Sequence, residues 1–85
     1  MKPTTSLMLR WILGQGVARI ACEINQNPDR TFNLRVVPSW SGRARIVGRF
    51  AGVVAAMERH AEIAGTLRES GWQVVERTSP ARHAA

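Results

Sequence analysis

Residues 43–71 read RARIVGRFAGVVAAMERHAEIAGTLRESG, and the spacing of their apolar residues changes near Phe50. Before Phe50, apolar and polar residues alternate, as in a strand with one buried face. Between Gly52 and Ser70 the apolar residues recur every three or four positions, which predicts a helix with Gly71 as its left-handed C-cap residue. A strand that leads directly into an amphipathic helix indicates the α+β class.

The predicted helix has one wide apolar arc, which suits packing across one face of a sheet in two layers. At about 100° per residue, the arc holds Val53, Val54, Ala56, Met57, His60, Ala61, Ile63, Ala64 and Leu67. In the strand before it, residues 43–50, one face is expected to carry Ala44, Ile46, Gly48 and Phe50 toward the helix. The outward face is then expected to carry Arg43, Arg45, Val47 and Arg49. Gly48 marks either a bulge or a close approach of the helix.

Two further strands are predicted upstream, and together the three form an antiparallel meander. Residues 17–25 place Ile20, Cys22 and Ile24 on one face. After a turn at residues 27–30, the strand at 31–37 places Phe32, Leu34 and Val36 inward, and a second turn follows at 39–42. The fold expected is therefore a three-stranded antiparallel meander packed by one helix.

The ends of the chain are assigned by weaker patterns. Residues 72–77 are expected to add a short fourth strand, giving β-β-β-α-β, either at the sheet edge or across a dimer interface. Residues 1–16 form an N-terminal arm or an additional edge strand, with a turn at 14–16. Residues 17–77 then make a single α+β domain, and residues 78–85 a flexible tail.

The charge is unevenly distributed. The chain has 85 residues, 12 Lys and Arg against 6 Asp and Glu, and a formal net charge of +6. All of the excess lies in residues 1–49, and every cation except Lys2 is an arginine, the side chain suited to phosphate and base contacts. RNA or DNA is therefore one predicted partner. The alternative is a high-GC genome, whose codons favour Arg and Ala.

The outward face of the predicted meander is the candidate binding surface. Its arginines would create a positive field suited to a nucleic-acid backbone, and Trp40, in a turn, offers a ring on which a base could stack. The alternative is a solvated sheet face with Trp40 folded back over the hydrophobic edge. The candidate nucleic-acid-binding residues are Arg19, Arg35, Trp40, Arg43, Arg45 and Arg49.

No constellation of residues indicates an enzyme. The sequence contains no Gly-rich phosphate loop, HExxH, CxxC or GxSxG motif, so no catalytic residue, metal site, cofactor or small-molecule substrate is predicted. His60 lies on the apolar arc, where it could in principle meet Cys22 as a nucleophile pair or as two metal ligands. The favoured interpretation is a core histidine bonded to a backbone carbonyl, with Cys22 as a small buried hydrophobe.

Self-association is the second predicted function. The apolar segments at residues 7–13 and 72–75 exceed what a three-strand, one-helix core can use, so each could pair with another copy or another protein. Trp11 and Trp72, among aliphatic neighbours, are expected to anchor a core or an interface. A single cysteine and the absence of a span of about 20 apolar residues favour a cytoplasmic protein without a membrane partner. Arg10 and Arg19 interrupt the faint signal-peptide pattern near the N-terminus.

A resemblance supports this order of elements. The pattern Arg-x-Arg-x-Val-x-Arg-Phe at 43–50, Glu-x-His-x-Glu at 58–62, then Leu67 and Gly71-Trp72 resembles small bacterial proteins with a β-meander followed by a helix. The resemblance covers about the last two thirds of the chain. Because that group has no established activity, it implies the fold and nothing about function.

Overall fold

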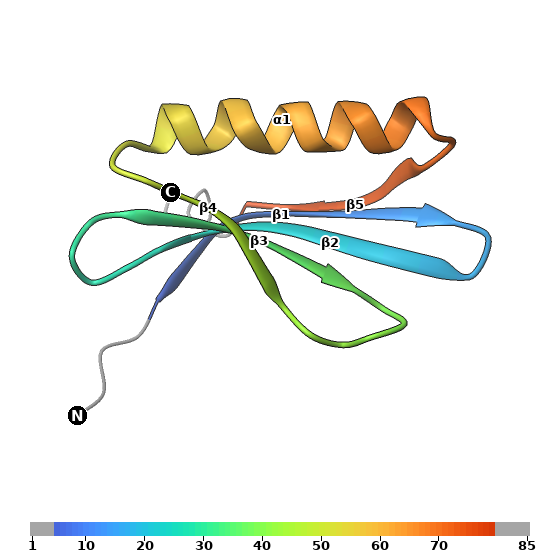
Figure 1. The fold of residues 1–85 in the computed structure, drawn as a ribbon, viewed down its shortest axis with the longest axis horizontal. Helices are drawn as coiled ribbons and strands as arrows, with labels where there is room; N and C mark the ends of the chain where they lie inside the picture. Colours follow the sequence, from blue (N-terminus) through green and yellow to red (C-terminus); the bar gives the residue numbers. More distant parts are fainter. Residues whose placement is uncertain (1–4, 80–85) are drawn as a thin grey trace.

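A computed structural model describes residues 5–79, which form one sheet and one helix (Figure 1). The helix α1 lies across one face of the sheet, and no element of the described residues covers the other face, which we call the open face. No helix among these residues is long and apolar enough to cross a membrane. The elements in chain order are β1 (Ser6–Gln15), β2 (Ala18–Gln26), β3 (Phe32–Pro38), β4 (Arg45–Phe50), α1 (Val53–Glu69) and β5 (Gln73–Thr78).

The sheet has five strands in the order β4-β3-β2-β1-β5, with every neighbouring pair antiparallel. The α+β class and the antiparallel sheet are as predicted, but a three-stranded meander with a short fourth strand understates the sheet. β1 is an inner strand that pairs with β2 along its length and with β5 on its other side. β1 takes an inner position because it supplies Leu13 to the core, where this side chain is fully buried beneath the helix.

The boundaries predicted at the two ends of the chain differ from those of the structure, because β1 and β5 both belong to the sheet. Residues 6–15 form a strand, which was one of the two predicted alternatives, but it is an inner strand and not an edge strand. Thr78 is the last residue of β5. The predicted flexible tail therefore begins at least one residue too early. The remainder of that tail, from Pro80 onward, lies outside the described residues.

The core lies between the helix and the inner face of the sheet, in two adjoining clusters. One cluster contains Leu13, Ile20, Cys22 and Ala64. The other contains Ile24, Phe32, Leu34 and Ala56. The inward faces predicted for residues 17–25 and 31–37 are thus confirmed.

The apolar arc of α1 is narrower than predicted. Ala56, His60 and Ala64 are its buried residues, and the two alanines allow the helix to approach the sheet closely. Val54 and Met57, expected on the buried arc, are 66% and 50% exposed. A single sheet layer contacts only one stripe of a helix, so residues on the flanks of a wide arc remain in water.

The C-terminal end of α1 is closed as predicted. Gly71 has a φ of +97°, and the amides of Gly71 and Trp72 donate to the carbonyls of Arg68 and Leu67, which is the hydrogen-bond pattern of a Schellman motif. The Gln15 side-chain amide donates to the Ser70 carbonyl at 2.9 Å. This bond fixes the end of the helix to the β1–β2 turn.

A bulge in β4 changes which side its residues face. Leu34 pairs with Gly48, but Arg35 pairs with Ile46, so Val47 is an extra residue in β4. The bulge predicted near Gly48 is confirmed, and the Phe50 ring lies over Gly48, where a Cβ would meet it at 2.7 Å. Beyond the bulge the alternation inverts: Arg45 shares the helix side with Val36, and Ile46 lies on the open face with Arg35. The predicted facing of Arg45 and Ile46 was therefore wrong.

Candidate nucleic-acid interface

The six candidate binding residues do not share one surface. Arg35 and Arg49 lie on the open face, and Arg19 also points there, over Gly14. Trp40, Arg43 and Arg45 line a groove on the helix side of the sheet. The prediction of one arginine-rich outward face is thus replaced by two separate groups on opposite sides of the sheet.

The arginines at the centre of the open face are engaged with Glu23. Arg10, Glu23 and Arg35 are cross-strand partners in β1, β2 and β3. The Arg10 Nε donates to one Glu23 carboxylate oxygen at 2.7 Å, and the Arg35 Nε lies 3.3 Å from the other. The Glu23 side chain is only 9% exposed. This carboxylate neutralises part of the positive field that the sequence predicted for this face.

Arg19 and Arg49 also have partners within the chain. The Arg19 guanidinium donates to the backbone carbonyls of Gly16 and Ala18, each at 2.9 Å. The Arg49 Nη2 donates to Asp29 at 2.9 Å. Hydrogen bonds from the Thr31 hydroxyl and amide, together with the Arg49 charge, lower the pKa of Asp29. The three open-face candidates are therefore held by groups of the protein itself.

The groove on the helix side, which we call the β4 groove, lies between α1 and the β3–β4 end of the sheet. It has a volume of about 850 Å³ and is lined by Val36, Pro38, Trp40, Ser41, Arg43, Ala44, Arg45, Val47, Arg59 and Ile63. No carboxylate is among these lining residues. Arg59 forms an exposed pair with Glu62 at 2.9 Å, a weak interaction in water, whereas Arg43 and Arg45 form no ion pair within residues 5–79.

Trp40 is held at the mouth of this groove by the β3–β4 turn. The amide of Gly42, a residue with φ +65°, donates to the Pro38 carbonyl at 3.0 Å, and the Ser39 amide donates to the Arg19 carbonyl at 2.8 Å. The Trp40 residue is 65% exposed. Its ring centroid lies 6.2 Å from that of Trp72, with the planes at 41°. Trp40 therefore forms a tilted pair with the other indole and leaves much of its surface in water.

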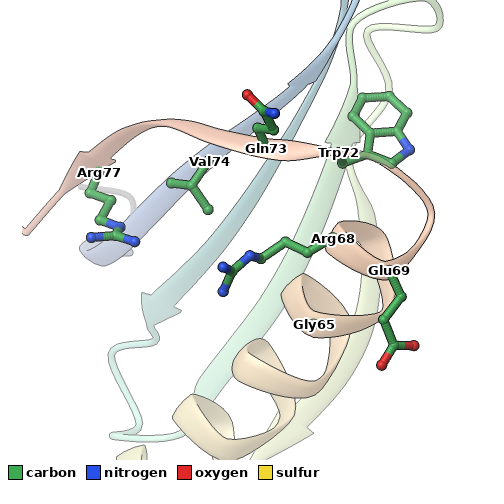
Figure 2. A pocket seen from close by; sticks show the side chains of 7 residues that line it. All are labelled: Gly65, Arg68, Glu69, Trp72, Gln73, Val74 and Arg77. Carbon is green, nitrogen blue, oxygen red and sulfur yellow. The ribbon is translucent and has the colours of Figure 1, made fainter.

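A second groove, the β5 groove, lies on the other flank of the helix, between α1 and β5 (Figure 2). Its volume is about 720 Å³. Figure 2 shows the side chains of Arg68 and Arg77 pointing into the space between helix and strand, with the Glu69 carboxylate pointing away. The lining residues are Gly65, Arg68, Glu69, Trp72, Gln73, Val74 and Arg77.

Sequence reasoning missed the arginines that α1 and β5 bring to these grooves. Arg59, Arg68 and Arg77 lie in the half of the chain where cations and anions balance, so the charge count gave no signal for them. A helical wheel alone places Arg59 beside Glu58 and Glu62 on a solvated face. Only the position of α1 over the sheet shows that Arg59 lies at the rim of a groove.

Cys22 and His60 lie in the core, as the favoured interpretation predicted. The His60 Nε2 is 3.1 Å from the Cys22 carbonyl oxygen, and the ring is edge-on to Trp11 with centroids 5.1 Å apart. A carbonyl only accepts, so the ring donates to it through a proton on Nε2. Burial lowers the pKa of His60, and burial with the nearby Glu23 charge raises the pKa of Cys22 to about 11. The predicted core role of Trp11 is confirmed by this packing.

The pairing of β1 with β5 also changes the case for self-association. The apolar segments at 7–13 and 72–75, which motivated that hypothesis, lie in or next to these two strands of one chain. Among residues 5–79, no cluster of three or more His, Cys, Asp or Glu side chains could hold a metal ion. Comparison with protein-family models, with curated proteins and with solved structures finds no match for the chain.

Proposed function

We propose that the protein is a small nucleic-acid-binding module that holds the phosphate backbone in the β4 groove and a base on Trp40. The observation that carries the proposal is an indole 65% exposed beside a groove lined by arginines and by no carboxylate. Arginine forks onto phosphate oxygens, and an exposed aromatic ring is a sequence-tolerant platform for bases. Binding is expected to show little sequence preference and strong salt dependence.

The first test is an amide NMR titration of the isotope-labelled protein with mixed-sequence RNA and DNA at low and moderate salt. Salt-sensitive shifts are expected at Trp40, Arg43, Arg45 and Arg59, which line the groove. The absence of shifts at low salt would contradict the proposal. Shifts confined to Arg10 and Arg35 would move the interface to the open face.

Charge reversal in the groove gives the matched comparison. The double variant Arg43→Glu, Arg45→Glu is expected to lower affinity by more than about tenfold, because two phosphate contacts become repulsive. The control is Arg30→Glu, Arg49→Glu, which changes net charge equally at the β2–β3 end of the sheet, away from the groove. Equal losses in both variants would indicate attraction by net charge alone.

Trp40→Ala tests the role of the indole separately from charge. The loss of a stacked base is expected to cost about 1–3 kcal/mol of binding free energy. Trp40 is 65% exposed and lies outside both core clusters, so the variant should retain the fold. Its unfolding temperature, measured beside the wild type, checks this.

Self-association is a second candidate function, favoured by one observation. β4 and β5 each have a single neighbour in the described sheet, and Val75 in β5 is 53% exposed. An edge strand with an exposed apolar side chain can pair with a second copy. Sedimentation equilibrium would then show a mass of two chains, which Val75→Lys returns to one. A single-chain mass at the highest concentration would remove this candidate.

A further inference from the structure

The two grooves on either side of α1 are joined by a pair of indoles, of which Trp40 is exposed and Trp72 is partly buried against the core. Trp40 lines the β4 groove and Trp72 lines the β5 groove. Their ring centroids are only 6.2 Å apart. A chain that leaves the β4 groove at Trp40 therefore meets Trp72 next and can enter the β5 groove around the C-terminal end of the helix.

The β5 groove carries its own anion-binding groups. Arg68, in the last turn of α1, and Arg77, in β5, direct their side chains into the same space, and Glu69 points out of it (Figure 2). Neither arginine forms an ion pair within residues 5–79. The Arg77 guanidinium carbon lies 4.7 Å from the centroid of the Trp11 ring, which holds this side chain in place from below. Two oriented cations across one groove suit phosphate oxygens.

The geometry points to a single-stranded nucleic acid as the ligand, running from the β4 groove over Trp40 and Trp72 into the β5 groove. This inference rests on the proposed function and extends it to a ligand class and a second half-site. The two indole planes are tilted by 41°, so successive bases stacking on them cannot stay parallel. Bases in a duplex are stacked parallel and paired, whereas an unpaired strand can turn its bases individually.

The test measures the affinity of the intact protein for single-stranded homopolymer DNA of two lengths and for a duplex. Small single-strand-binding folds cover roughly 4–16 nucleotides. The two oligothymidines have about four and about twelve nucleotides, so one lies at the short end of this range and the other in its upper part. The longer strand is expected to bind more tightly and with a steeper salt dependence, because only it reaches both grooves. A duplex of equal length is expected to bind more weakly than the long single strand.

The deciding variant is Arg68→Gln, Arg77→Gln. It is expected to reduce the steepness of the salt dependence for the long strand by about 1.4, since each single-strand phosphate contact contributes about 0.7. Binding of the short strand, which the β4 groove alone accommodates, should not change. Arg68→Lys, Arg77→Lys keeps both charges and should restore the slope, which separates a phosphate contact from loss of the Arg77–Trp11 contact.

The outcomes separate the two proposals. The β5 half-site is overturned if the glutamine variant leaves the salt-dependence slope of the long strand unchanged. The proposed function still stands in that case if Arg43→Glu, Arg45→Glu lowers affinity by more than about tenfold. Duplex binding equal to that of the long strand overturns the single-strand specificity. No binding of any oligonucleotide by the wild type overturns the proposed function, and the inference with it.

Discussion

At the scale of single residues, Cys22 and His60 are two potentially reactive side chains. Both are buried in the core, where their charged forms are disfavoured. Cys22 is fully buried between sheet and helix, and His60 lies directly above its carbonyl. In a low-dielectric core the neutral forms of both groups are favoured. An imidazole that donates to a backbone carbonyl is a satisfied core residue, and both side chains pack between the sheet and the helix.

Thiol alkylation tests the state of Cys22. The thiol has a pKa of about 11 and no exposure, so almost no thiolate is present or reachable at neutral pH. Iodoacetamide is therefore expected to leave the native protein unmodified over hours and to modify it fully in denaturant, as measured by intact mass. Rapid native modification would show that the core opens or that the thiol is activated.

The pH dependence of stability tests His60. Its folded-state pKa is lowered by burial, so as pH falls below about 6.5 the unfolded chain binds a proton before the native protein does. The contribution of His60 to the free energy of unfolding is thus expected to be complete above that pH. It should be lost as the pH falls, so the free energy of unfolding decreases between pH 7 and pH 5. His60→Leu should flatten this dependence in urea unfolding measured across the range.

At the scale of elements, turns and caps follow local chemistry, whereas strand facing depends on register. The Schellman cap at Gly71 and the turns at 27–30 and 39–42 lie where their residues predicted them. The facing of β4 was wrong because one extra residue, Val47, inverts the alternation before it. A glycine indicates that a bulge is available, but only pairing with β3 decides which residue is extra.

A pair of glycine substitutions with opposite signs tests the end of α1. Gly71→Ala forces a left-handed φ on alanine, at a cost of about 1–2 kcal/mol, and its Cβ would lie 2.7 Å from the Gln15 amide nitrogen. Gly65→Ala, inside the helix with no atom within 4 Å of the added Cβ, is expected to stabilise by about 0.5–1 kcal/mol. Thermal or urea unfolding of both variants measures the difference. Equal effects would show that the cap geometry is wrong.

At the scale of the whole molecule, the inner position of β1 decides stability. A peripheral arm would contribute little, but β1 joins β5 to the rest of the sheet and buries Leu13 completely. Leu13→Ala is therefore expected to destabilise the protein by about 2–5 kcal/mol. Val17→Ala, at a residue 99% exposed in the adjoining turn, is the control and should change stability by less than about 0.5 kcal/mol. A small effect of Leu13→Ala would return β1 to the role of a loose arm.

The candidate site could be predicted only in part. Arginine enrichment and the place of Trp40 in a turn were evident in the sequence, and Trp40, Arg43 and Arg45 do lie together. The sequence did not show that the other three candidates, Arg19, Arg35 and Arg49, lie elsewhere and have partners. Strand pairing brings those partners near: the backbone carbonyls, Glu23 and Asp29, respectively. Arg68 and Arg77 meet across a groove formed by the helix and a strand that follows it.

By itself the sequence determined the α+β class, the two inward strand faces, the helix with its glycine cap and the buried state of His60. Each of these depends on residues a few positions apart, so periodicity and turn chemistry suffice to find them. Tertiary structure alone decided the inner place of β1, the side of the sheet on which Arg45 lies and the arginine-lined grooves beside α1. These depend on register and on contacts between distant segments, where one added residue moves a side chain to the opposite face.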